Sequence, residues 1–239
     1  MNNSKDNNLI FGRNPVKEAL RANKVLKVFV VNNFSDKEIN LLLQEKKPPI
    51  KVVSSAEMDS MVHGVHQGIV ASVKPYEYSD LDEILRRSRK VEVPIIVILD
   101  GINDTHNLGA ILRSCDVFNV TGVLIPKHNQ VPLNATVAKS SAGAINFVPV
   151  AQIGSINQTL QRLKDNGFWI VSTDGGAKID YHQITYDFPV ALVIGSEGKG
   201  VSPLVIKNSD YVVKIPQYGH VNSLNASVAA GILLAKIRN

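Results

Sequence analysis

Runs of apolar residues alternate with helix-like segments along the chain, and this alternation predicts an α/β fold. After position 93 the apolar runs are continuous, which is typical of strands buried on both faces of a parallel sheet. We expect such strands at 94–99, 122–125, 168–172, 190–194 and 211–215. Apolar residues at helical spacing predict helices at 108–118, 135–142, 156–164 and 224–237. Strands alternating with helices favour a parallel sheet covered by helices on both faces.

A smaller α/β unit precedes this region. β-Branched runs predict strands at 25–31, 50–53 and 68–73, and helical spacing predicts helices at 36–46 and 56–62. The charged segment 76–92 then carries a basic cluster of four residues: Arg86, Arg87, Arg89 and Lys90. Because this cluster alternates with apolar residues at helical spacing, a solvated helix face is a better interpretation than an RNA contact. We therefore expect a first domain at 9–75, a linking helix within 76–92 and a second domain at 93–239.

Composition narrows the class of protein only modestly. The 239 residues are 44% hydrophobic, as in ordinary globular proteins, and carry a net charge of +5, which is compatible with a nucleic-acid partner. The single cysteine, Cys115, excludes an intrachain disulfide. No apolar run is long enough to cross a bilayer, and the polar segment 1–8 lacks the apolar core of a signal peptide. We expect a cytoplasmic protein without a membrane segment, with 1–8 as a disordered tail.

Candidate chemistry follows the strands, because ligands of open α/β sheets bind at the carboxyl ends of the strands. After Leu99, a polar loop leads into a helix that presents Asn107 and Arg113. These two residues are six positions apart and do not stack directly on a helix, although both can border one cleft. The alternative interpretation is a capped helix with a surface arginine.

Two further loops contain unusual residues. Gly195, Gly198 and Gly200 surround Glu197, in a loop that matches neither a Walker motif nor a dinucleotide fingerprint. This loop can be interpreted either as a tight turn or as a loop that binds a ligand. After Ile215, a short loop leads to Ser223, which we expect to cap the last helix, and to Asn225, which has no evident structural role.

Together, three segments resemble the motifs of the SpoU/TrmH family of RNA ribose methyltransferases, within the SPOUT superfamily. The first motif is similar to residues 107–113, the second to 195–200, and the third to Ile215–Pro216 with 223–228. In the N-terminal part, 11–20 and 65–70 look like the substrate-binding domain of the subgroup that methylates a guanosine of 23S ribosomal RNA. That domain is similar to the L30e type of ribosomal protein fold.

The resemblance implies a fold and a set of partners that the pattern alone does not. It implies a parallel-sheet methyltransferase domain with a deep trefoil knot, preceded by a small L30e-like α/β domain. It also implies a homodimer, S-adenosylmethionine as cofactor, RNA (23S ribosomal RNA above all) as substrate, and no metal. The small departures from the family lie at 217–220 and at Asn222.

The resemblance also implies roles for individual residues. Catalytic positions match Asn107, Arg113, Glu197, Ser223 and Asn225. Cofactor-binding positions match Thr173, Gly195, Gly200, Ile215 and Leu224. RNA-binding positions match Gly12, Arg13, Asn14 and Arg113.

The roles within the catalytic group can be refined by chemistry. A guanidinium holds its proton too firmly to be a good base, so we expect Arg113 to clamp a phosphate of the RNA. We expect Glu197 and Asn225 to orient Arg113 and the loops, and Ser223 and Asn107 to contact RNA or its phosphate.

Other conspicuous residues have simpler interpretations. Cys115 and Trp169 are expected in the core, and His63 and His66 in a loop without metal. Two other functions compete with the main one: methylation of tRNA, and RNA binding without catalysis in ribosome assembly. The sequence does not identify the target nucleotide, the general base, the role of 217–220, or whether naked RNA or an assembling subunit is the substrate.

Overall fold

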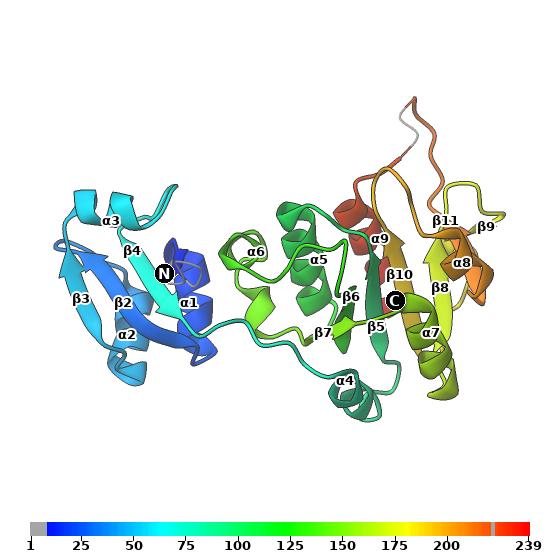
Figure 1. Cartoon of the computed structure of the whole chain (residues 1–239), viewed down its shortest axis with the longest axis horizontal. Coiled ribbons are helices and arrows are strands. Elements are labelled where there is room, and N and C mark those ends of the chain that lie inside the picture. The colour runs from blue at the N-terminus through cyan, green and yellow to red at the C-terminus, as the bar shows by residue number, and fades with distance from the viewer. Residues whose placement is uncertain (1–8, 221–222) are drawn as a thin grey trace. The chain divides into compact units, whose positions relative to one another are not determined.

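The computed structural model describes residues 9–220 and 223–239, which form two compact units (Figure 1). One unit comprises the described residues up to Glu77 together with 132–147, and the other comprises 78–131 and 148–239. The expected tail at 1–8 and the position of Asn222 lie outside the described residues.

The first unit is built on a four-stranded sheet with the order β1-β4-β2-β3. Its elements are β1 (Leu9–Phe11), α1 (Arg13–Arg21), β2 (Val25–Val31), α2 (Lys37–Lys46), β3 (Ile50–Val53), α3 (Ser55–Met61), β4 (Ile69–Val73), α6 (Ala135–Ser140) and the 3₁₀ turn η1 (Ala144–Asn146). Only β2 and β3 pair in parallel. Side-chain caps start α2 and α3: Asp36 accepts from the Ile39 N–H at 3.0 Å, and Ser54 accepts from the Glu57 N–H at 3.1 Å.

The segment 132–147 belongs to this first unit although it lies far from it in sequence. Asn134 caps α6 by accepting from the Val137 N–H at 3.0 Å, and the Lys139 ammonium lies 4.5 Å from the Phe11 ring centroid. Gly143 has a φ of 94°, and a Cβ there would lie 2.2 Å from the Glu18 Cβ. A glycine is therefore required where this segment meets α1.

The second unit is built on a seven-stranded sheet with the order β7-β6-β5-β10-β8-β11-β9, in which every pair is parallel. The strands are β5 (Ile95–Asp100), β6 (Gly122–Pro126), β7 (Val150–Ile153), β8 (Trp169–Thr173), β9 (Ile179–Asp180), β10 (Val190–Gly195) and β11 (Tyr211–Lys214). The helical elements are α4 (Leu81–Ser88), α5 (Thr105–Val117), α7 (Ile156–Asp165), the 3₁₀ turn η2 (Tyr181–Gln183), α8 (Pro203–Lys207) and α9 (Ala226–Arg238). The expected parallel sheet is confirmed.

Helices cover both faces of this sheet. Apolar side chains of α4, α7 and α8 pack into one core cluster with β5, β8 and β10; Leu85, Leu163 and Val205 are examples. On the other face α9 packs against α5 and β10, and Figure 1 shows α5 and α9 as neighbours. The strands β5 and β10 are buried on both faces, which explains their continuous apolar sequences.

Some elements differ from the sequence prediction. The edge strand β7 was not expected, because four residues that include Gln152 give a weak strand signal. Trp169 was expected in the core, yet it is 45% exposed, and this prediction is wrong. It begins β8, where the preceding Phe168 takes the core position, and it stacks on Tyr211 with ring centroids 5.7 Å apart.

The trefoil knot and the similarity of the first unit to the L30e fold, both implied by the family resemblance, stay predictions. Among the described residues, no helix is long and apolar enough to cross a membrane.

Candidate active site

A cavity of about 170 Å³ lies at the carboxyl ends of β8, β10 and β11. Its lining includes all five residues expected to bind a cofactor: Thr173, Gly195, Gly200, Ile215 and Leu224. Two of the expected catalytic residues, Glu197 and Ser223, line it as well. The cavity occupies the edge of the sheet where parallel α/β folds bind ligands.

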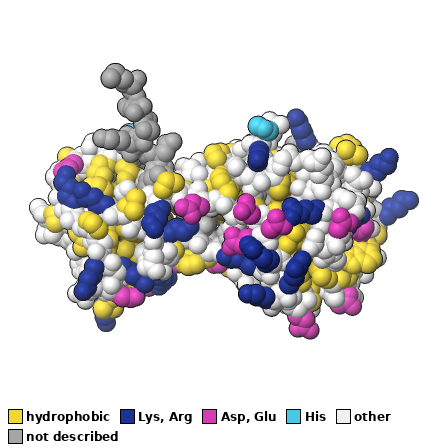
Figure 2. Space-filling view, turned by 60° about the horizontal axis from the view of Figure 1, so that its bottom comes forward, with side chains coloured by type: hydrophobic (Ala, Val, Ile, Leu, Met, Phe, Trp, Pro, Cys, Tyr) yellow, Lys and Arg dark blue, Asp and Glu magenta, His cyan; other side chains and the backbone are white. Residues whose placement is uncertain are grey.

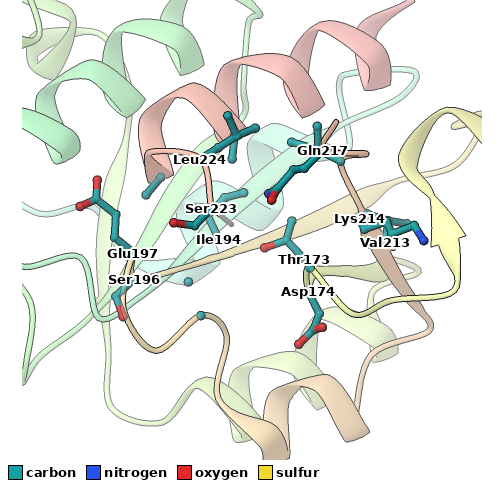
Figure 3. A pocket seen from close by; sticks show the side chains of 16 residues that line it. Thr173, Asp174, Ile194, Ser196, Glu197, Val213, Lys214, Gln217, Ser223 and Leu224 are labelled. Atoms are coloured by element: carbon teal, nitrogen blue, oxygen red, sulfur yellow. The ribbon is translucent and has the colours of Figure 1, made fainter. Parts of the chain in front are cut away.

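The cavity has an apolar wall and polar rims. Figure 3 shows Gln217, Thr173 and Ser223 pointing toward its middle, whereas Glu197 and Asp174 point outward at its edges. The Lys214 ammonium is turned to the side and lies 3.7 Å from the Asp180 carboxylate. The polar groups that face the cavity are therefore uncharged, and its charged groups stand at the margin.

Gly195 is required for the shape of the cavity. A Cβ at this position would lie 2.0 Å from the Gly200 carbonyl carbon and 2.2 Å from the Val201 nitrogen. The loop 195–201 folds back on itself at this point, and the Gly200 N–H donates to the Ser196 carbonyl at 2.9 Å. Gly200 itself has a φ of 65°, which a glycine adopts without strain. The turn that forms one wall of the cavity therefore requires glycine at position 195 and favours it at position 200.

Three of the expected catalytic side chains meet at the edge of this cavity. The Asn107 amide donates to Glu197 Oε1 at 3.0 Å, and the Asn225 amide donates to Asn107 Oδ1 at 2.8 Å. The Asn225 amide also donates to Glu197 Oε1. This Asn107–Glu197–Asn225 cluster joins the start of α5, the loop after β10 and the start of α9.

Asn225 also has a structural role that the sequence did not suggest. Its Oδ1 accepts from the Ser227 N–H at 2.9 Å and from the Ser227 hydroxyl at 2.6 Å, so Asn225 is the N-cap of α9. The expectation that Ser223 caps this helix is wrong, because the helix begins later, at Ala226. Ser223 is exposed and faces the cavity instead.

A second cavity, of about 320 Å³, lies on the other side of Glu197. It is lined by residues 101–104 and Asn107, and it shares Ser196 and Glu197 with the first cavity. Asp104 at its rim caps α5 by accepting from the His106 N–H at 2.8 Å. Glu197 therefore stands between two cavities and lines both of them.

Arg113 lies on α5, on the exposed surface. Its guanidinium has no hydrogen bond or ion pair within residues 9–220 and 223–239. Glu197 and Asn225 bond Asn107 and each other, and no hydrogen bond joins either of them to Arg113 among the described residues. Their role in orienting Arg113 stays a prediction. An unpaired guanidinium is free to bind an anionic group.

The expected RNA-binding residues of the first unit lie at the start of α1. Gly12 precedes the helix with a φ of 91°, and Asn14 is exposed. The Arg13 guanidinium lies 3.5 Å from the Asp36 carboxylate and 5.7 Å from the Phe34 ring centroid. Arg13 thus has intramolecular partners, and only part of its side chain is available for RNA.

Other residues singled out in the sequence have structural roles. Cys115 is fully buried, and burial raises the pKa of its thiol well above the usual range, which makes it unreactive. His66 Nδ1 accepts from the Gly68 N–H at 2.9 Å, and its Nε2 lies 3.1 Å from Asp59 Oδ1. No group of three or more potential metal-ligating side chains occurs in the described part of the chain.

The basic cluster on and after α4 is exposed and interspersed with other groups. Arg87 pairs with Glu83 at 2.8 Å, and Arg89 donates to Asn166 at 3.5 Å. Figure 2 shows lysine and arginine side chains mixed with aspartate and glutamate on the face it displays. This arrangement agrees with a solvated helix face.

Several lining residues were missed in the sequence. Asp174, Ser196 and Gln217 line the first cavity but were not among the expected site residues, although Ser196 lies within the second motif and Gln217 within the variant loop 217–220. Their position in the sequence could have identified them, because each of them closely follows a buried strand, where ligands of α/β sheets bind.

Family models match almost the whole chain. The SpoU rRNA Methylase family model matches residues 94–235, and a model described as RNA 2′-O ribose methyltransferase substrate binding matches residues 9–79. A Staphylococcus aureus protein named as a TrmH family tRNA/rRNA methyltransferase is 40% identical over 237 residues, covering 97% of this chain and 96% of that protein.

Solved structures show the same fold. The SpoU methyltransferase AviRb from Streptomyces viridochromogenes, crystallised with the cofactor AdoMet, has a TM-score of 0.82 at 23% identity and covers 98% of this chain and 89% of its own. The A. aeolicus TrmH/SpoU tRNA modifying enzyme has a TM-score of 0.56 at 31% identity and covers 66% of this chain and 82% of its own.

Proposed function

The chain belongs to the SpoU family of RNA 2′-O-ribose methyltransferases, and from this premise we propose that it methylates a guanosine ribose of 23S ribosomal RNA, with S-adenosylmethionine as methyl donor. One observation carries the proposal. The cavity that holds every expected cofactor-binding residue adjoins the Asn107–Glu197–Asn225 cluster. A methyl donor and a polar acceptor site are thereby adjacent, as methyl transfer requires.

The first cavity suits the adenosine part of the cofactor. Ile194, Ile215 and Leu224 provide apolar surface for a purine, and Gly195 leaves backbone groups accessible beside it. Thr173 and Gln217 present polar groups toward the middle of this cavity. The cofactor, when bound, supplies an electrophilic methyl group on a sulfonium. Support comes from the AviRb structure, which was crystallised with AdoMet.

The second cavity suits the methyl acceptor. Glu197 and Asn107 line it with oxygen and amide groups that can hold a ribose in place. Because Glu197 Oε1 accepts from two amides, the carboxylate is held between the two cavities. Arg113, which has no partner in the described chain, clamps an RNA phosphate, and Ser223 and Asn107 contact the RNA.

The N-terminal unit favours ribosomal RNA over tRNA. The A. aeolicus tRNA modifying enzyme covers only 66% of this chain, whereas residues 9–79 match a substrate-binding model of their own. An extra RNA-binding domain fits a large structured RNA. The tRNA alternative rests on the names of relatives such as the S. aureus tRNA/rRNA methyltransferase.

We further infer that the protein acts as a homodimer. Leu224 lies just before α9 and is exposed, as are Val228 in the first turn of α9 and Val117 at the end of α5, and these two helices pack together. A second copy that covered this surface would remove apolar area from water.

Transfer of labelled methyl from S-adenosylmethionine to RNA tests the proposal. Unmodified 23S ribosomal RNA is expected to accept label, and a tRNA pool is not. Label in tRNA alone would establish the tRNA alternative. Calorimetry with S-adenosylhomocysteine tests the assembly-factor alternative, because a protein that binds RNA without catalysis has no need of the cofactor and would give no heat.

A further inference from the structure

Tyr218 is the most exposed of the large apolar and aromatic side chains in the described chain. Its side chain is 95% exposed, and no ring contact or hydrogen bond joins it to another described residue. The next most exposed aromatics, Phe147 and Trp169, are both 45% exposed, and Trp169 stacks on Tyr211. A large apolar ring held in water is unfavourable unless a partner covers it. Tyr218 therefore offers a fully accessible aromatic face to a binding partner.

The position of Tyr218 relates it to the candidate active site. It lies in the connection between β11 and α9, and Figure 1 shows the described part of this connection extending away from the sheet. The preceding residue, Gln217, lines the cofactor cavity. Ser223, at the other end of the connection, lines it as well. Tyr218 is thus carried by a loop whose base forms the wall of the cavity.

The surroundings of Tyr218 fit a nucleic-acid base better than a protein surface. Its neighbours Gln217, Gly219 and His220 are all exposed and none is aliphatic. A protein interface surrounds an aromatic anchor with further apolar groups, and the described residues directly beside Tyr218 supply none. An unpaired base needs only one aromatic face, and such stacking recognises single-stranded RNA.

From these observations, we propose that Tyr218 stacks on an unpaired base of the RNA substrate, next to the nucleotide whose ribose is methylated. This inference rests on the proposed function, since it assumes an RNA acceptor beside the cofactor cavity. The stack would hold the RNA at the rim of the site. Tyr218 would then determine RNA affinity without contributing to cofactor binding or to the methyl-transfer step.

Three variants test this proposal: Tyr218→Ala, Tyr218→Phe and Tyr218→Leu. Stacking on one base contributes about 1–3 kcal/mol, so Tyr218→Ala is expected to raise the KM for unmodified 23S ribosomal RNA about 5- to 150-fold. The kcat at saturating RNA and the affinity for S-adenosylhomocysteine should stay within about twofold of wild type. Tyr218→Phe should restore the KM, because the ring makes the stack. Tyr218→Leu should not, because it keeps apolar area without a π face.

A direct binding measurement separates this proposal from the proposed function. Tyr218→Trp in a Trp169→Phe background places a single tryptophan at the loop, and its fluorescence should be quenched by a single-stranded RNA oligonucleotide. Quenching without methyl transfer to any RNA would contradict the proposed function but support stacking of residue 218 on a base. Methyl transfer with an unchanged KM in Tyr218→Ala would overturn the stack alone. A full rescue by Tyr218→Leu, or a changed molecular mass of Tyr218→Ala in solution, would also overturn it and indicate contact with a second copy.

Discussion

The Asn225 amide donates to the Asn107 side-chain oxygen at 2.8 Å and joins two helix starts that are 118 residues apart in the chain. Each residue also donates to Glu197, so three loops of the second unit meet at one carboxylate. Asn225 uses its oxygen to cap α9 and its nitrogen to hold this cluster. One side chain therefore links the stability of a helix to the geometry of the candidate site.

Replacing Asn225 separates these two roles. Asn225→Ala removes the cap and the cluster, and it should lower the free energy of unfolding by about 1 kcal/mol and reduce kcat strongly. Asn225→Asp keeps a good capping oxygen but loses the amide donor and places a second carboxylate beside Glu197. We expect near wild-type thermal unfolding with a large loss of kcat for the aspartate variant. Equal activity of wild type and Asn225→Asp would show that the amide donor has no role.

The Gly195→Ala replacement tests the cavity wall. Its Cβ would collide with the backbone of Gly200 and Val201, so the loop must shift. Binding of S-adenosylhomocysteine should weaken about tenfold or more, measured by calorimetry. The matched control is Gly198→Ala in the same loop, where a Cβ has nothing within 4 Å. An unchanged affinity in Gly195→Ala would remove this loop from the cofactor site.

The Gly143→Ala replacement tests the packing of segment 132–147 in the first unit. The φ of 94° and the contact with Glu18 both oppose a side chain at this position. We expect the free energy of unfolding to fall by about 1–3 kcal/mol in urea. Gly154→Ala, which meets nothing within 4 Å, serves as the control. If both variants unfold alike, the packing of this segment against α1 does not stabilise the protein.

Arg113→Lys tests whether a bidentate clamp operates. A lysine keeps the charge but cannot present two parallel donors to a phosphate, so kcat/KM for RNA should fall while the affinity for S-adenosylhomocysteine stays unchanged. Steady-state kinetics with 23S ribosomal RNA measure this. Near-full activity of the lysine variant would show that Arg113 acts only through its positive charge and not as a bidentate clamp.

The sequence predicted the fold better than it predicted the contacts within the site. Continuous apolar runs such as β5 and β10 identify strands buried on both faces, and that rule needs no knowledge of their neighbours. Trp169 was misplaced, because the strand pattern does not tell which of two adjacent aromatics faces the core at the end of a strand.

Relationships between residues far apart in the chain could not be predicted from local sequence patterns. A capping role for Asn225 depends on where α9 begins, and the helix start favoured by the pattern was two residues earlier. The membership of 132–147 in the first unit follows from contacts of α6 and η1 with α1 and of α6 with β1, which are separated by more than a hundred positions in the sequence. The family motifs did identify the residues around the cavity, but not that Glu197 and Asn225 bond Asn107 rather than Arg113.

The most direct test of the central claim is to map methylated riboses in 23S ribosomal RNA after incubation with S-adenosylmethionine and either wild-type or Arg113→Ala protein. We expect one ribose 2′-O-methyl group on a guanosine with the wild-type protein. We expect almost none with Arg113→Ala, although that variant should still bind S-adenosylhomocysteine. Equal methylation by both proteins, or methyl groups on bases instead of riboses, would contradict the central claim.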